Sequence, residues 1–159
     1  MKITIVCAGK LKEKYLRNGI AEYEKRLRPY ADVRAIEIAE ERMKDKPSAA
    51  EKMETIRREG ERLAVHVPRD AYLIVLDVGG MEYSSEKFSA KIDRLCVEGQ
   101  SHIAFLIGGS FGLSEQLLRE ADLCLSFSRF TFPHQLIRLF LMEQIYRAFK
   151  ISRGEPYHL

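Results

Sequence analysis

Two short runs in the sequence, residues 71–76 (AYLIVL) and residues 102–107 (HIAFLI), have almost no polar position. A strand with one face in water alternates apolar and polar residues, whereas a strand covered on both faces is apolar throughout. Each run is followed by a segment typical of a helix, at residues 84–99 and again after Ser114. This alternation predicts an α/β fold, with a mostly parallel sheet and helices on both of its faces.

The rest of the chain continues the same alternation. Ser48 and Glu51 have the spacing of a capping box and begin a helix. Pro133 begins the final helix, in the first turn where proline is tolerated. Further strands are expected at 2–10, 33–39 and 123–127, with a further helix at 15–28. With 159 residues and no repeat or linker, the sequence predicts a single domain over residues 1–159.

The composition is ordinary for a globular protein, with 46% hydrophobic and 31% charged residues. No apolar run approaches the roughly 20 residues that span a bilayer, so we expect a cytoplasmic protein without a membrane partner. The cysteines and histidines have no spacing that fits zinc, so no metal is expected. The net charge of +3 permits a polyanionic partner but does not require one.

Three segments at predicted strand ends carry unusual residues: 76–80, 107–112 and 127–132. Ligands of open α/β sheets bind at the carboxyl ends of the strands. The glycine pattern does not fit a dinucleotide fold, which needs G-x-G-x-x-G after the first strand and an acidic residue about 20 positions later. It does not fit a P-loop, because no Lys-Ser/Thr pair follows the glycines. Simple turns remain an alternative interpretation of the glycines.

The third segment, FSRFTFPHQ, has no glycine and combines aromatic rings with hydroxyl groups and an arginine. Such a loop offers backbone donors and acceptors to a flat heterocycle and aromatic walls beside it. Three largely neutral loops around an apolar cavity suit a nucleoside without phosphates. The adenosyl part of S-adenosylmethionine is one such ligand.

The runs VLDVGG, FLIGGSFGLSE and SFSRFTFPHQLIRLFLMEQIYRAFKISRGEPYHL resemble the trefoil-knotted SPOUT methyltransferases. Within that family the chain is similar, over nearly its whole length, to the minimal enzymes that methylate N3 of a pseudouridine in 23S rRNA. The resemblance implies a C-terminal trefoil knot that forms a pocket for S-adenosylmethionine, and a homodimer that acts on 23S rRNA of the ribosome. The expected cofactor-binding residues are Leu76, Gly80, Gly108, Gly109, Phe127, Ser128, Arg129, Phe130, Thr131 and Phe132.

Two of these residues have specific expected roles. At Gly108 a side chain would intrude on the ligand, and Leu76 is expected to lie against the adenine.

The last helix independently favours a dimer. Its apolar side chains cover more than one stripe, and one sheet face cannot bury so wide a surface. A helix at the centre of the fold is the alternative. The apolar residues are Leu136, Ile137, Leu139, Phe140, Leu141, Ile145, Tyr146 and Phe149.

Methylation of an imide nitrogen requires loss of its proton, so a base or a cation that favours the anion is expected. The catalytic candidates are His134, Arg138, Tyr157 and His158. Each also has a structural interpretation: helix-terminus packing for His134, an interface or phosphate contact for Arg138, and a disordered tail for the last two. The family pattern usually ends in a basic residue, where this chain has Leu159.

Two other functions stay open at this point. One is a different enzyme that binds an adenosyl group or a nucleotide on the same sheet. The other is a ribosome-associated factor that kept the fold without the chemistry.

Overall fold

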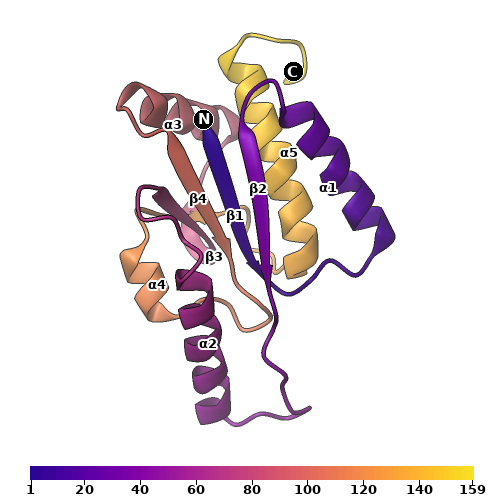
Figure 1. Cartoon of the computed structure of the whole chain (residues 1–159), viewed down its shortest axis with the longest axis vertical. Helices are drawn as coiled ribbons and strands as arrows, with labels where there is room; N and C mark the ends of the chain where they lie inside the picture. The colour runs from indigo at the N-terminus through magenta and orange to yellow at the C-terminus, as the bar shows by residue number, and fades with distance from the viewer.

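The computed structural model describes all 159 residues and contains one sheet of five parallel strands in the order β2-β1-β4-β3-β5 (Figure 1). The α/β fold with an all-parallel sheet is as predicted. The elements along the chain are β1 (Lys2–Ala8), α1 (Lys14–Leu27), β2 (Asp32–Ile38), α2 (Ala49–Ala64), β3 (Tyr72–Glu82), α3 (Ser85–Val97), β4 (His102–Ile107), α4 (Glu115–Glu120), β5 (Leu123–Ser126) and α5 (His134–Ser152).

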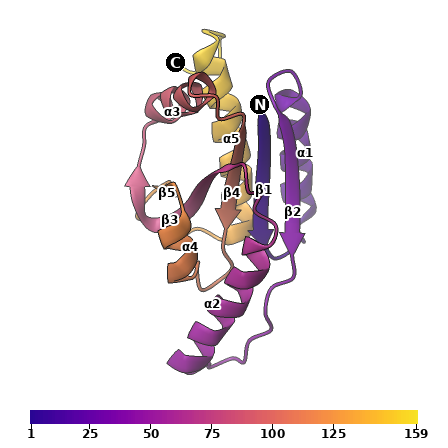
Figure 2. The same ribbon diagram turned by 60° about the vertical axis from the view of Figure 1, so that its left-hand side comes forward.

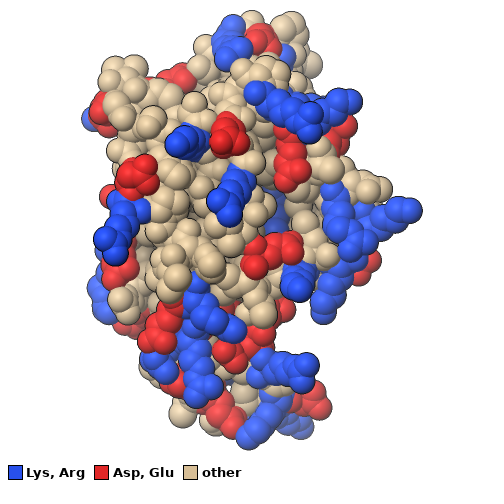
Figure 3. Space-filling model, in the orientation of Figure 1, with Lys and Arg blue, Asp and Glu red and all other residues tan.

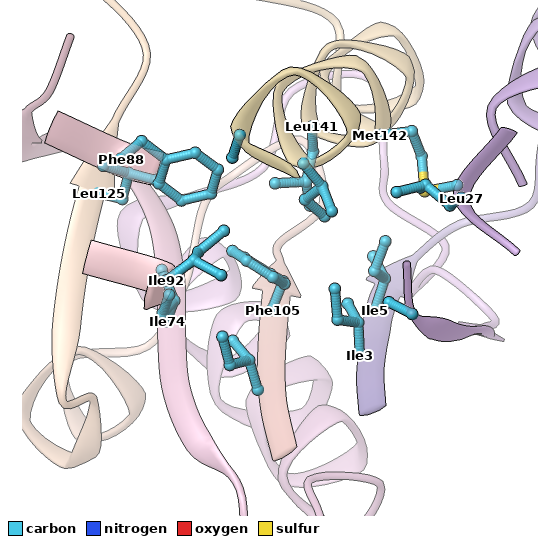
Figure 4. Packing of buried hydrophobic residues seen from close by; sticks show 14 of the residues in the cluster. Ile3, Ile5, Leu27, Ile74, Phe88, Ile92, Phe105, Leu125, Leu141 and Met142 are labelled. Carbon is cyan, nitrogen blue, oxygen red and sulfur yellow. The ribbon is translucent and has the colours of Figure 1, made fainter. Parts of the chain in front are cut away.

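Helices cover both faces of the sheet, as the unbroken apolar runs predicted. On one face α5 lies between α3 and α1, and on the other lie α2 and α4 (Figures 1 and 2). Successive residues of β4 point to opposite faces, so Phe105 packs under α5 with Leu141 while Leu106 joins the cluster that includes Leu63 of α2. Figure 4 shows the first of these clusters between the strands and α5. No helix is long and apolar enough to cross a membrane.

The local signals for the helix starts are confirmed. The Ser48 side chain accepts a hydrogen bond from the backbone N–H of Glu51, and the Glu51 carboxylate accepts one from the backbone N–H of Ser48, which completes the capping box. The Ser114 side chain caps α4 by accepting one hydrogen bond, from the backbone N–H of Leu117. Pro133 occupies the N-cap position of α5. Strand β2, whose sequence interleaves polar and apolar residues, lies at one edge of the sheet.

Strand β3 differs from the prediction because it does not end at Leu76. The chain leaves the ladder after Leu76 and returns, so that Leu125 of β5 pairs with both Leu76 and Met81. Gly80 allows this return, because a Cβ at that position would lie 2.7 Å from the carbonyl carbon of Cys124. The detour displaces residues 77–80 from the sheet at its carboxyl edge.

A buried guanidinium joins the carboxyl end of β1 to β2 and α5. Arg138, only 4% exposed, donates hydrogen bonds to Oε1 of Glu37 at 2.8 Å and to the carbonyl oxygen of Ala8 at 2.7 Å. It also donates to the carbonyl oxygen of Gly9. A buried charge without these partners would be strongly unfavourable, so the interaction holds the start of α5 against the strand ends.

We predict that Arg138→Met lowers the free energy of unfolding by about 3 kcal/mol, because it removes the guanidinium donor from the carbonyl groups of Ala8 and Gly9 and the ion-pair partner from Glu37. Urea denaturation measures the change. Arg94→Met is the matched control, because Arg94 forms an exposed ion pair with Glu98 and its loss should change the midpoint little. Equal midpoints for the two variants would contradict the anchoring role of Arg138.

Candidate active site

The three predicted strand-end segments meet in one cavity of about 680 Å3 at the carboxyl edge of the sheet. A cavity of this size suits a small-molecule ligand. The ends of β3, β4 and β5 form its floor, and the segment before α5 forms one wall. Of the expected site residues, the cavity is lined by Leu76, Gly108, Gly109, Phe127, Ser128, Phe130, Thr131, Phe132 and His134.

Two expected cofactor-binding residues do not line the cavity. Gly80 lies against the backbone of β5, where it serves the strand detour. Arg129 points away, almost fully exposed, with its Nε 3.8 Å from Oε1 of Glu82.

Other lining residues were not singled out by sequence reasoning. Most of them lie inside or directly beside the predicted segments, and this position is the signal that could have identified them. The ten residues are Asp77, Val78, Ile107, Ser110, Phe111, Gly112, Leu125, Ser126, Pro133 and Ile137.

The glycine segment after β4 is a tight turn whose own packing requires glycine. The backbone N–H of Gly112 donates to the carbonyl oxygen of Gly109 at 3.1 Å, and Gly112 has a positive φ of 84°. A Cβ on Gly108 would lie 2.7 Å from the carbonyl oxygen of Gly112. Glycine at 108 is therefore explained by the turn itself, which differs from the expected clash with a ligand. A bulky residue there would distort the loop before it could affect any ligand.

A buried carboxylate from the opposite helical layer holds this turn. Glu59 of α2 is 6% exposed, and its Oε1 accepts a hydrogen bond of 2.9 Å from the backbone N–H of Gly109. A Cβ on Gly109 would lie 2.7 Å from the same oxygen, so a larger residue there would displace the Glu59 carboxylate from this position. Burial raises the pKa of Glu59, and hydrogen bonds from the backbone of Gly109 and Glu41 act in the opposite direction. Glu59 is thus a positioning residue for the turn.

The chemical character of the cavity is largely neutral. None of its 19 lining residues is Lys or Arg, and Asp77 is the only acidic one. The apolar walls include Leu76 and Phe127, and hydroxyl groups and backbone at the rim supply the polar groups. Without a cation, the cavity is poorly suited to a phosphate and well suited to an uncharged heterocycle with a few directed hydrogen bonds.

Two of the catalytic candidates lie on the first turns of α5. His134 lines the cavity, and its Nε2 lies 2.8 Å from Oε1 of Glu40 at the rim. Arg138, one turn later, points away from the cavity and is occupied by Glu37 and the carbonyl groups at the end of β1. Direct contact of Arg138 with a substrate would require it to leave these partners.

The other two candidates lie at the opposite end of the molecule (Figure 1). Tyr157 donates a hydrogen bond of 3.0 Å to Oε1 of Glu143 and packs edge-on against Tyr146. His158 is held between Glu86, 2.8 Å from its Nε2, and Arg147, 3.2 Å from its Nδ1. The tail is therefore folded onto α3 and α5 instead of extending freely.

Distance separates this tail from the cavity of its own chain. Helix α5 has 19 residues and is about 28 Å long, with His134 at the cavity end. Residues 154–159 span at most about 20 Å when fully extended. The tail cannot reach the cavity of the same chain without unwinding α5.

The buried carboxylate gives a pH-dependent prediction. Because folding raises the pKa of Glu59 above its ordinary value of 4.5, the wild type should lose stability as the pH rises through the folded-state pKa. Glu59→Gln keeps an acceptor for Gly109 but removes this titration. The stability of Glu59→Gln relative to wild type should therefore increase as the pH rises above about 4.5.

Urea denaturation at several pH values measures this difference, and a difference that stays constant with pH would contradict the assignment. Glu59→Ala removes the acceptor altogether, so it should accelerate hydrogen exchange of the Gly109 amide.

Comparison with known proteins agrees with this architecture. A family model described as a predicted SPOUT methyltransferase matches residues 1–158. A ribosomal RNA large subunit methyltransferase H from Carboxydothermus hydrogenoformans is 52% identical over 158 residues, 99% of each chain. Proteins of the same name from Bifidobacterium adolescentis and an Exiguobacterium species are 50% and 49% identical, again over 99% of each chain. The chain belongs to the SPOUT methyltransferase family.

Proposed function

We propose that this protein is an S-adenosylmethionine-dependent methyltransferase that methylates N3 of a pseudouridine in 23S rRNA. It acts in the cytoplasm, as a homodimer of single-domain chains with a C-terminal trefoil knot, which the family supports. The observation that carries the proposal is the neutral cavity at the strand ends, in a chain whose relatives are named as methyltransferases of large-subunit rRNA.

The residues present fit S-adenosylmethionine. Its adenosyl part carries no phosphate and matches a cavity without Lys or Arg, where Leu76 and Phe127 offer apolar contact to the base. Asp77, the only carboxylate in the wall, complements the positive charge of the ligand. The backbone of the turn at Gly108 and Gly109, held by Glu59, would supply hydrogen bonds. When bound, the ligand supplies an electrophilic methyl group.

A second subunit is needed to complete the site, because the tail cannot reach the cavity of its own chain. In a two-fold dimer the tail of each chain can meet the cavity of its partner. An apolar patch beside the cavity supports this assembly: Phe140 is 39% exposed and packs edge-on against Phe132, with the exposed Phe130 nearby in sequence. Elsewhere α5 is covered by α1 and α3, which accounts for much of the apolar width noted in the sequence.

The tail side chains are suited to hold a uracil ring. Burial raises the pKa of Tyr157, so its hydroxyl group stays protonated and can donate to a carbonyl oxygen of the base. The imidazole of His158 can exchange a hydrogen bond with the imide, and Arg147, which contacts it, places a cation nearby. Such a cation favours the imide anion that attacks the methyl group. His134 at the rim of the receiving cavity is a second candidate for the proton acceptor.

The two alternative functions require different ligands. An NAD or nucleotide enzyme commonly places Lys or Arg beside the phosphates of its ligand, and the cavity wall contains neither. A non-catalytic ribosomal factor would need no methyl donor. Calorimetric titration with S-adenosylmethionine and with NAD separates them, and we expect binding of the first alone.

Mass mapping of 23S rRNA from a strain that lacks this protein tests the activity itself. We expect one pseudouridine in the large-subunit RNA to lose a methyl group and to regain it when the purified protein and S-adenosylmethionine are added. An unchanged modification map would overturn the proposed function.

We predict that Phe140→Glu converts the dimer to a monomer, because the contact would bury an unpaired carboxylate. Leu139 is unsuitable for this test, since it packs against Gly19 of α1 within the chain. Val97→Glu serves as the control because Val97 is an exposed apolar residue on α3, far along the chain from the patch. Light scattering reports the mass, and a monomeric wild type would contradict the dimer.

Deletion of residues 157–159 should abolish methylation and leave the affinity for S-adenosylmethionine near that of the wild type. The pocket segments lie at the other end of α5, so their geometry does not depend on the tail. Calorimetry and single-turnover methylation of ribosomes give the two values. Full activity of the truncated protein would return Tyr157 and His158 to a purely structural role.

A further inference from the structure

The positive charge of this protein is concentrated in one segment. Residues 10–28 contain seven Lys and Arg and three Glu, a net charge of +4, whereas the whole chain has +3. The remaining 140 residues are therefore net negative by one charge. This segment comprises the β1–α1 connection from Lys10 onward, all of α1, and Arg28 directly after it.

These cations are largely without acidic partners. Arg26 pairs with Glu22, and no carboxylate lies within ion-pair distance of the six others: Lys10, Lys12, Lys14, Arg17, Lys25 and Arg28. All six are exposed. By comparison, α2 is as rich in charge, but its Arg57 and Arg58 are bound to Glu54 of the same helix. We call the six unpaired cations the α1 basic face.

The helical members of this face share one side of α1. Four of them fall within one stripe along the helix, because their spacings of three, eight and three residues are close to whole turns. They are Lys14, Arg17, Lys25 and Arg28. The buried side chains Leu16, Ile20 and Leu27 lie on the other side and join the core. In the space-filling view, blue groups project at the right-hand edge where α1 lies (Figures 1 and 3).

An exposed aromatic ring accompanies the cations. Tyr15 is 66% exposed and is the only exposed tyrosine of the seven in the chain. Cations interleaved with an exposed aromatic ring are the pattern of a surface that follows a nucleic-acid backbone and stacks on a base.

The α1 basic face begins at the rim of the candidate active site. The backbone N–H of Lys12 donates to Oε1 of Gln135 at 3.1 Å, in the first turn of α5. A Cβ on Gly9 would lie 3.1 Å from Nε2 of His134, which lines the cavity. An RNA strand whose target base enters the cavity would therefore pass next to Lys10 and Lys12.

We propose that the α1 basic face binds the phosphate backbone of the rRNA that flanks the target nucleotide, with Tyr15 stacking on an unpaired base. This inference rests on the proposed function and adds its docking surface. The apolar side of α1 is buried in the core, so the helix has no free apolar face with which to enter a lipid surface. Unpaired cations in a line suit the regular phosphates of RNA.

The test compares two variants with the same change in charge. In the first, Lys12, Lys14 and Arg17 are replaced by Gln; in the control, Arg69, Arg94 and Arg119, which lie outside α1 and away from the cavity wall, are replaced by Gln. Binding to unmethylated ribosomes and large subunits is measured from low to high salt. Loss of three phosphate contacts should reduce the slope of log affinity against log salt by about 2 to 3 and weaken binding at least tenfold at physiological salt.

The affinity for S-adenosylmethionine and the thermal midpoint should stay unchanged in both triple variants, which separates docking from folding. If the first variant binds and methylates ribosomes like the control, the docking surface is wrong while the methyltransferase function stands. If the wild type binds no ribosomal particle and methylates none, the proposed function itself fails.

Discussion

The direction of helix α5 relative to the sheet determines most of what this molecule can do. All five strands are parallel, so their carboxyl ends and the loops that follow them gather at one edge. Helix α5 starts at that edge, beside the cavity, and runs back over the sheet to the other end. The ligand cavity and the C-terminal tail are thereby separated by the length of a helix. In the proposed dimer, the partner chain brings these two candidate functional elements together.

Two buried charged side chains fix the cavity end of this arrangement. Arg138 joins α5 to the ends of β1 and β2, and Glu59 joins α2 to the turn at Gly109. They come from opposite helical layers and act on neighbouring strand ends. The turn at Gly109 and the start of α5, which both line the cavity, are consequently held from opposite faces of the sheet, which favours a preformed site over one that forms on binding.

The sequence was most informative where one local rule decides the structure. Unbroken apolar runs predicted a buried parallel sheet, and strand ends with glycine or aromatic residues predicted the segments that line the cavity. The sequence did not predict features that depend on packing between residues far apart in the chain. The detour at Gly80 depends on the backbone of β5, and the need for glycine at 108 depends on Gly112. Glu59 resembles its many exposed neighbours on α2, so only the fold reveals that it is buried.

If one chain supplies the cavity and its partner supplies the tail, two inactive subunits with different defects should restore activity when they are mixed. One subunit carries Leu76→Arg, which places a bulky cation in the cavity, and the other lacks residues 157–159. Each homodimer should be inactive. After equimolar exchange, half of the dimers are mixed and each has one intact site, so roughly a quarter of the wild-type methylation rate should return. A mixture as inactive as its parents would contradict the shared site.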